Sequence, residues 1–250
     1  MQQHLILHLD APLMSFGGDT VDNLGIVRDF PAFSMIVGLI GNALGFERYE
    51  TDKLDHLQDR LTMGFLRFQE GRRFQDFQTA QLEKKDRGWT TLGRLEYRRG
   101  GAATYESPHI RYRDLDANAV VIVALRLKNA EENPTLSDIV KALDHPERPL
   151  FLGRKPFIPS RPIAGVIVEA ADVATALEIA ISGAAHGFRS QWPEGEGTRP
   201  GSRATHLTDQ RDWNAGVHTG RRAVIEASLS GQTVGVDRTI TSQPVEGIHP

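Results

Sequence analysis

Apolar and polar positions repeat along this chain with two different periods, and each period predicts a different kind of element. From His4 to Pro12, leucines alternate with other side chains and the run stops at a proline, as expected for a short strand. Three later runs, 117–127, 163–170 and 221–229, are rich in β-branched residues and predict further strands. The first of the three is almost continuously apolar, so we expect it to be buried on both faces.

Helices are predicted where apolar residues recur at three- and four-residue spacing. Residues 33–46 follow this spacing after Pro31, a residue that suits the first turn of a helix. Residues 135–146 repeat it between a hydroxyl-bearing cap residue and a closing proline, and residues 172–181 predict a shorter helix.

The order of these elements predicts an α+β fold. The order is strand, helix, strand-rich middle, strand, helix and strand. This is the order of a ferredoxin-like βαββαβ core, the RRM or RAMP type, with a large insertion between its halves. We expect this core over residues 1–182. From residue 183 the chain turns polar and rich in glycine and arginine. This composition predicts a partly irregular C-terminal extension over 183–250, in which 183–220 is mobile or ordered by a partner.

The longest nearly uncharged apolar run, FPAFSMIVGLIGNALGFER at 30–48, admits several interpretations. Its apolar part is shorter than the roughly 20 residues of a membrane span, and its glycine spacing differs from the G-x-G-x-x-G of a dinucleotide loop. On a helix, Ser34, Gly38, Gly41 and Gly45 form a stripe opposite the apolar face. Glycine weakens helices, so the stripe indicates close approach of another backbone. Packing on the protein's own strands is favoured over contact with RNA, and both stay open.

Charge is unevenly distributed in a chain whose net charge is only −3. Residues 1–60 carry nine acidic and four basic side chains, whereas residues 84–113 carry eight basic and three acidic ones, together with Trp89 and three tyrosines. Cations that neutralise phosphates beside aromatic rings that stack on bases are typical of single-stranded RNA recognition. A solvated hairpin with ion pairs is an equally good interpretation.

A second basic window lies at 151–163, where Arg154, Lys155 and Arg161 stand beside Gly153 and three prolines. This composition predicts a stiff loop that holds its cations outward and lets a phosphate approach the glycine backbone. Taken alone, an ordinary connector between a helix and a strand is the better interpretation. Two basic windows in an acidic protein favour the anion-binding one.

Catalytic signals are weak. The chain has no cysteine, which excludes disulfides and thiolate sites and fits a reducing compartment, and no secretory signal is evident, so we expect a cytoplasmic protein without a membrane segment. The histidines form no H-E-x-x-H motif, so neither a metal nor another cofactor is expected. His109 alone stands where it could act on RNA as a general acid or base.

These residues together resemble the CasD (Cas-five) family, whose members are subunits of CRISPR surveillance complexes. FPAFSMIVGLIGNALGFER resembles the family's first-helix motif. DFQT at 76–79, ESPHIRYRDLDANAVVIVAL at 106–125 and PLFLGRKPFIPSRPI at 149–163 follow in the family's order. The similarity is closest to the type I-E (Cascade) branch and spans roughly residues 3–170.

The resemblance implies a RAMP protein that holds the 5′ handle of the CRISPR RNA at one end of the complex. It implies a β-hairpin thumb, here about residues 76–116, packed against the neighbouring backbone subunit and the RNA. It also implies contact with the large subunit that reads the target, so that target DNA is met only through the complex. The family's Thr-Arg before the helix serine is Ala32-Phe33 here, so Arg28 or the helix N-terminal amides must replace that RNA contact.

The resemblance and the basic windows together predict a non-catalytic RNA-binding subunit. In the type I-C branch the family protein is itself the endoribonuclease and uses a Tyr and a Lys-His pair, but no Lys-His dipeptide occurs in this chain. The alternative is a metal-independent endoribonuclease that uses His109 with Tyr97, Tyr105 or Tyr112. The predicted RNA-binding residues are Arg28, Ser34, Arg94, Tyr97, Arg98, Arg99, Arg111, Tyr112, Arg113, Arg154, Lys155 and Arg161.

Overall fold

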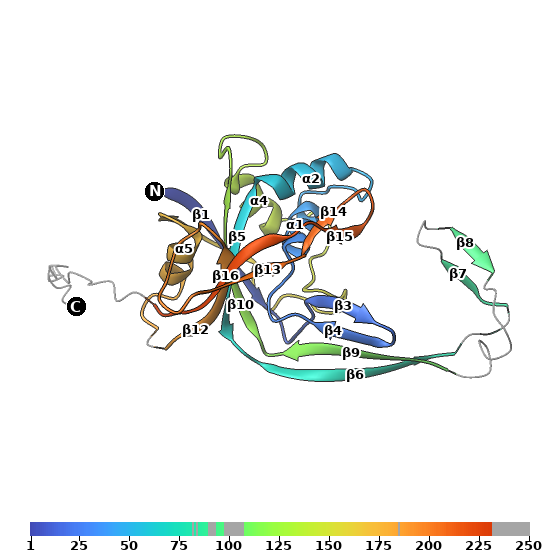
Figure 1. The fold of residues 1–250 in the computed structure, drawn as a ribbon. Coiled ribbons are helices and arrows are strands. Elements are labelled where there is room, and N and C mark those ends of the chain that lie inside the picture. Colours follow the sequence, from blue (N-terminus) through green and yellow to red (C-terminus); the bar gives the residue numbers. More distant parts are fainter. Residues whose placement is uncertain (82, 84, 90–93, 98–107, 185, 232–250) are drawn as a thin grey trace, which may run out of the picture.

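A seven-stranded antiparallel sheet forms the body of the protein in the computed structural model (Figure 1). The structure describes residues 1–250 except 82, 84, 90–93, 98–107, 185 and 232–250. The strand order is β11-β1-β10-β5-β12-β16-β13. These strands are β1 (Gln2–Asp10), β5 (Leu61–Gln69), β10 (Val120–Leu127), β11 (Ala164–Ala170), β12 (Phe188–Pro193), β13 (Arg203–Leu207) and β16 (Arg222–Leu229).

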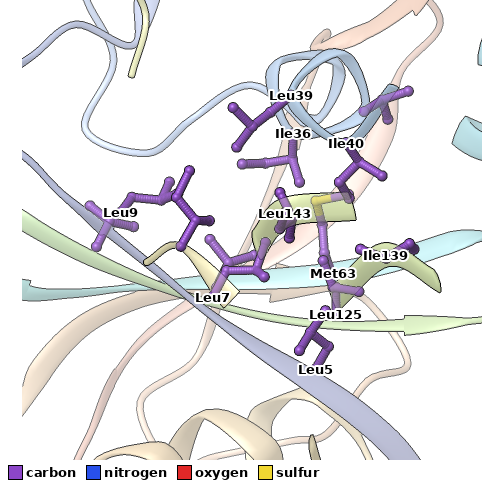
Figure 2. Packing of buried hydrophobic residues seen from close by; sticks show 14 of the residues in the cluster. Leu5, Leu7, Leu9, Ile36, Leu39, Ile40, Met63, Leu125, Ile139 and Leu143 are labelled. Carbon is purple, nitrogen blue, oxygen red and sulfur yellow. The ribbon is translucent and has the colours of Figure 1, made fainter. Parts of the chain in front are cut away.

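The larger hydrophobic core lies between this sheet and two helices, α1 (Phe33–Ala43) and α4 (Leu136–Asp144). Figure 2 shows Ile36 and Ile40 of α1 above Met63 of β5, with the β1 leucines running from Leu9 at the left to Leu5 at the bottom. Helix α4 begins with a capping box, in which the Thr135 and Asp138 side chains each accept from the other's backbone N–H. A third helix, α2 (Thr51–Arg60), packs against α1.

The opposite face of the sheet is covered by α5 (Val173–Ala180), which closes a second core around Trp192 and Leu177. Strand β10 serves both cores, because Val123 and Leu125 point to the first and Ile122 to the second. This confirms the prediction that its segment is buried on both faces.

A second sheet lies beside the body and carries a long ribbon (Figure 1). Strand β9 (His109–Ala117) is its centre: β6 (Arg72–Ala80) pairs with one edge along its whole length, and β2 (Leu13–Met14) and β4 (Leu24–Val27) pair with the other. Strand β3 (Gly17–Val21) pairs with β4 as a hairpin. Beyond the ribbon, β7 (Arg87–Trp89) pairs with β8 (Leu95–Tyr97).

The mixed α+β class predicted from the sequence is confirmed, and the neighbouring strands β11, β1, β10 and β5 are compatible with the predicted βαββαβ core. Strands predicted at 117–127, 163–170 and 221–229 correspond to β10, β11 and β16. From residue 183 onward, β12, β16 and β13 extend the same sheet, and β14 (Gln210–Asp212) pairs with β15 (Val217–Thr219) over α1. The segment 183–220, which we expected to be mobile or ordered by a partner, therefore forms strands within this chain.

The glycine stripe of α1 faces the protein's own side chains. A Cβ on Gly41 would lie 2.7 Å from Leu54 of α2, and one on Gly38 would lie 3.5 Å from Trp213, between β14 and β15. The Ser34 hydroxyl lies 2.9 Å from Nε2 of His218 on β15. Close packing within the chain, the favoured interpretation, explains most of the stripe.

In the described part of the chain no helix has both the length and the apolar character that crossing a bilayer requires.

Candidate nucleic-acid interface

A cleft of about 360 Å³ lies where the second sheet meets α1 and the loop 151–163. We call it the basic cleft, because its charged lining residues are all arginines. One wall is the β3–β4 hairpin, which contributes mainly glycine and small polar residues. The lining residues are Ser15, Gly17, Gly18, Thr20, Asn23, Gly25, Ile26, Ala32, Met35, Arg111, Tyr112, Arg113, Gly153 and Arg154.

The register of β9 decides which side chains share a face of the ribbon. Arg111 and Arg113 are two residues apart and therefore point to the same side, opposite Gln78 and Asp76 of β6. Tyr112 points to the other side, where its ring lies 5.4 Å from that of Phe77. The strand alternation thus separates an arginine face from an aromatic face.

The third arginine of the cleft, Arg154, comes from the loop 151–163 and is anchored to the ribbon. Its Nη2 donates to the backbone oxygen of Asp114 at 3.1 Å, and its Nη1 lies 3.6 Å from an oxygen of Asp76. Burial lowers the pKa of the Arg154 guanidinium, and the nearby Arg113 lowers it further. The group stays charged at neutral pH, so two like charges share this end of the cleft.

Gly153 fixes the loop against the cleft wall. Its φ is +100°, and a Cβ at this position would lie 1.9 Å from the backbone oxygen of Ser15. The adjoining Leu152 oxygen accepts the Ser15 N–H at 3.1 Å. Only glycine fits this close backbone approach, and it is this contact that sets Arg154 opposite β9.

The N-terminus of α1, which borders the cleft, is capped by a distant residue. Ala32 at the N-cap offers no side-chain acceptor. Asp209, after β13, accepts the Phe33 N–H on its carboxylate at 3.0 Å and the Ser34 N–H on its backbone oxygen at 3.0 Å. Two of the amides that we expected to meet RNA are thus already used within the chain.

Asp209 is almost completely buried, and Arg222 of β16 neutralises it. The guanidinium donates to both carboxylate oxygens at 2.7 Å and lies over the Phe33 ring at 5.2 Å. Such a bidentate pair is geometrically specific. The pair therefore ties α1 to the sheet extension formed by β13 and β16.

The root of the ribbon is held by a buried charge cluster. Arg67 of β5 is 2 % exposed and lies 3.2 Å from the carboxylate of Asp116, near the end of β9. Arg73 of β6 donates to the other oxygen of the same carboxylate at 3.0 Å. Asp116 thus links both strands of the ribbon to the central sheet.

The cluster continues to the surface through Asp29 and Arg189. Arg189 of β12 donates to Asp29 at 2.8 Å and to both carboxylate oxygens of Glu70. Burial alone would raise the pKa of Asp29, but the hydrogen bonds and charges of Arg189 and Arg73 outweigh burial and lower it. The segment that leads into α1 is therefore fixed to both sheets.

The remaining predicted site residues are dispersed. Arg28 lines a separate pocket of about 450 Å³ beside Arg189 and Arg203, and its Nη2 lies 3.4 Å from the Thr208 oxygen. Tyr97 accepts a hydrogen bond from Arg87 at 2.6 Å. Arg94, Lys155 and Arg161 are exposed, and Ser34 is buried against His218. Arg98, Arg99 and Tyr105 lie outside the described residues.

Several residues that shape the site were not identified from the sequence. The glycines of the β3–β4 hairpin carry a detectable signal, because GGDTVDNLG is a turn-rich segment between two apolar runs. The Asp209–Arg222 pair carries none, since its members contact α1 across more than 170 residues.

The structure brings together only some of the residues that the alternative nuclease function would need. His109 shares the face of β9 that carries Arg111 and Arg113, whereas Tyr112 points to the opposite face. Tyr97 belongs to the separate β7–β8 pair beyond the ribbon (Figure 1). Within the described ranges, no three His, Cys, Asp or Glu side chains gather in a way that could hold a metal ion.

Several solved structures share this fold, among them the following two. A chain of a "CRISPR RNA-guided surveillance complex" superposes with a TM-score of 0.67 at 22% identity, covering 91% of this chain and 90% of that one. A chain described as "Crystal structure of Cas protein" gives 0.59 at 23% identity, covering 91% and 95%. No curated protein matches this sequence.

The family model described as CRISPR-associated protein (Cas_Cas5) matches residues 4–225, which is most of the chain. The match includes the first-helix motif, the ribbon, the loop 151–163 and the strands up to β16. It confirms the family predicted from the sequence, and the chain therefore belongs to the Cas5 family of CRISPR-associated proteins.

Proposed function

We propose that this chain is a non-catalytic RNA-binding subunit of a CRISPR effector complex, of the type I-E branch, and that it binds the 5′ handle of the CRISPR RNA in the basic cleft. One observation carries the proposal: Arg111, Arg113 and Arg154 converge on one cleft from two distant segments of the chain. Both segments are basic windows of an otherwise acidic sequence.

The chemistry of the cleft suits a phosphodiester backbone. Arginines provide planar donors for phosphate oxygens, and a phosphate between Arg113 and Arg154 would relieve the repulsion from Arg113 that adds to burial in lowering the pKa of Arg154. Gly17, Gly18 and Gly25 on the opposite wall have no side chains that project into the cleft, so a chain of sugars and phosphates could approach the hairpin backbone.

The ribbon supplies the second part of the proposal. We infer that the body contains a ferredoxin-like core and that β6 and β9 form the stem of the thumb. The aromatic face with Phe77 and Tyr112 would contact the neighbouring backbone subunit, and the arginine face would contact RNA. The large subunit is the other expected partner, and target DNA would be met through the complex. The chain of a CRISPR RNA-guided surveillance complex that shares this fold supports this assignment.

Salt dependence of RNA binding tests the cleft directly. If three arginines each contact one phosphate, log K for single-stranded RNA should fall with log salt at a slope of about −2, from about −0.7 per contact. An Arg111→Gln/Arg113→Gln variant should reduce the slope to about −0.7 and weaken binding at low salt. Arg48→Gln, which removes an exposed charge outside the cleft, is the matched control and should leave both unchanged. A slope unchanged by the double substitution would remove the cleft from the proposal.

A metal-independent endoribonuclease is the second candidate, because His109 lies on the arginine face of β9. Incubation of the purified chain with repeat RNA in EDTA separates the two functions. Intact RNA supports the binding role, whereas specific cleavage that is lost in His109→Ala supports the nuclease.

A further inference from the structure

An acidic side chain lies at the edge of the basic cleft. Asp76 is on β6, and the strand register places it directly opposite Arg113 of β9, on the face of the ribbon that also carries Arg111. Its carboxylate lies 3.6 Å from Nη1 of Arg154. Among the described residues, Asp76 is the only acidic side chain that forms an ion pair with an arginine of the cleft. One of the three cations of the cleft is therefore already paired within the chain.

Arg154 keeps its position through other contacts. Its guanidinium donates to the backbone oxygen of Asp114 at 3.1 Å and lies 5.5 Å from the centre of the Phe157 ring. The contact with Asp76 is longer than a hydrogen bond, and the Asp76 side chain is 37 % exposed. Partly exposed ion pairs of this kind contribute little to stability. Another anion can therefore replace the Asp76 carboxylate at little cost to the fold.

The Asp76 carboxylate offers Arg154 the same kind of acceptor that a phosphate would offer, because guanidinium groups bind both with planar N–H donors. Gln78 donates to the carboxylate oxygen that faces Arg154 at 2.5 Å and so holds it in place. Burial and Arg113 lower the pKa of Arg154, and the negative charge of Asp76 opposes them. A phosphate that approaches Arg154 therefore meets a like charge at the position where it would bind.

We propose that Asp76 limits the affinity of the basic cleft for RNA, because its carboxylate competes with an RNA phosphate for Arg154. The inference rests on the proposed function, since it needs a phosphate in the cleft. In the free chain Arg154 is held in the ion pair, and RNA that is also bound by Arg111 and Arg113 replaces the carboxylate. A repulsive group inside a binding site is one way in which proteins weaken binding of unsuitable ligands.

Removing the charge without changing the shape of the side chain tests this proposal. Full-length protein is titrated with a labelled single-stranded oligouridine at about 0.15 M salt, where the Debye length is about 8 Å. Asp76→Asn should bind the oligouridine about 3- to 5-fold more tightly than the wild type, the upper range for one exposed ion pair. Asp76→Glu keeps the charge and should show no gain. A purely structural role of Asp76 would instead weaken binding in Asp76→Asn.

Two further variants assign the gain to competition for Arg154. Asp114→Asn is the matched control, because it removes the same charge from the neighbouring strand, on the opposite face of the ribbon, where Asp114 accepts a hydrogen bond from Gln75 at 3.2 Å. It should change the affinity by less than about 1.5-fold, since salt screens the more distant charge. Arg154→Gln removes the group for which carboxylate and phosphate compete, so adding Asp76→Asn to it should also give less than about 1.5-fold. Thermal unfolding checks that each variant is folded.

Three results would overturn the inference while leaving the proposed function in place. An unchanged or weaker affinity in Asp76→Asn would show that the carboxylate does not oppose RNA. An equal gain in Asp114→Asn would reduce the effect to the net charge of the ribbon. A full gain in the Arg154→Gln background would show that Arg154 is not the group in dispute. Absence of RNA binding by the wild-type chain would remove the proposed function and this inference together.

Discussion

Replacing Asp209 with alanine tests whether a residue beyond β13 holds the helix that borders the basic cleft. The carboxylate is 1 % exposed, and it accepts two hydrogen bonds from Arg222 and one from the Phe33 amide. Removing it leaves an almost buried guanidinium without its counter-charge and leaves an unsatisfied amide at the start of α1.

The expected loss follows from these two effects. Breaking a buried ion pair by removing one partner costs about 3–5 kcal/mol, and Arg222, whose side chain is 12 % exposed, places this pair at the lower end. The lost cap adds about 1 kcal/mol. A free-energy loss of about 4 kcal/mol corresponds to a fall in Tm of roughly 8–16 °C for a chain of this size.

Thermal and urea unfolding of the wild type and four variants, namely Asp209→Ala, Asp209→Asn, Arg222→Met and Asp209→Ala/Arg222→Met, measures this loss. Asp209→Asn keeps an oxygen that can accept the Phe33 N–H. It should therefore keep the helix cap and lose only most of the ion-pair contribution to the free energy of unfolding. Asp209→Ala/Arg222→Met removes both charges, so it should lose less than the sum of its single substitutions. A loss below about 1 kcal/mol in Asp209→Ala would refute the argument that this pair fixes α1.

Two further predictions concern the loop 151–163 and the pH dependence of stability. Gly153→Ala should lower the unfolding free energy by more than about 3 kcal/mol, because the new Cβ would overlap the Ser15 oxygen. Gly195 has φ +88° and open space around it, so the control Gly195→Ala should lower the unfolding free energy by only about 1 kcal/mol. Equal losses would contradict the role of the close approach. Burial lowers the pKa of His4 and of His8 below the ordinary 6.5, so the unfolded chain binds protons first as pH falls and urea midpoints should decline from pH 7.5 to 5.5. A His4→Met variant should decline less steeply, and identical pH profiles would show that His4 does not contribute.

The elements that were predicted from the sequence are those with strong local patterns. Residues 33–46 carry a regular apolar spacing and a starting proline, and the segment 120–127 is continuously apolar, so pattern alone decides them. Helix α2 was missed because its ten residues, TDKLDHLQDR, are almost all polar. It is helical because Leu54 packs against Gly41 of α1 and Leu57 joins the main core, contacts that no local window contains.

The same distinction holds for the candidate site: local sequence predicted some of its residues, but only the fold brings them together. Composition found Arg111, Arg113 and Arg154, because clustered charge is visible in sequence. Their convergence depends on pairing between β4 and β9 and on the Gly153 contact with Ser15, which join residues more than 80 positions apart. Ser34 was predicted to bind RNA from its place in a motif. Its actual contact is His218 of β15, and the position of β15 over α1 depends on the whole sheet.

The charge cluster at the root of the ribbon has a mechanical consequence. Strand β6 has nine residues, so at about 3.3 Å per residue the ribbon is a lever of roughly 30 Å. A tilt of about 10° where Asp116 meets Arg67 and Arg73 would displace its far end by about 5 Å, more than the length of a hydrogen bond. The accuracy with which the distant end of this protein meets another molecule is therefore determined by a few buried charges at the near end, where no partner needs to touch it.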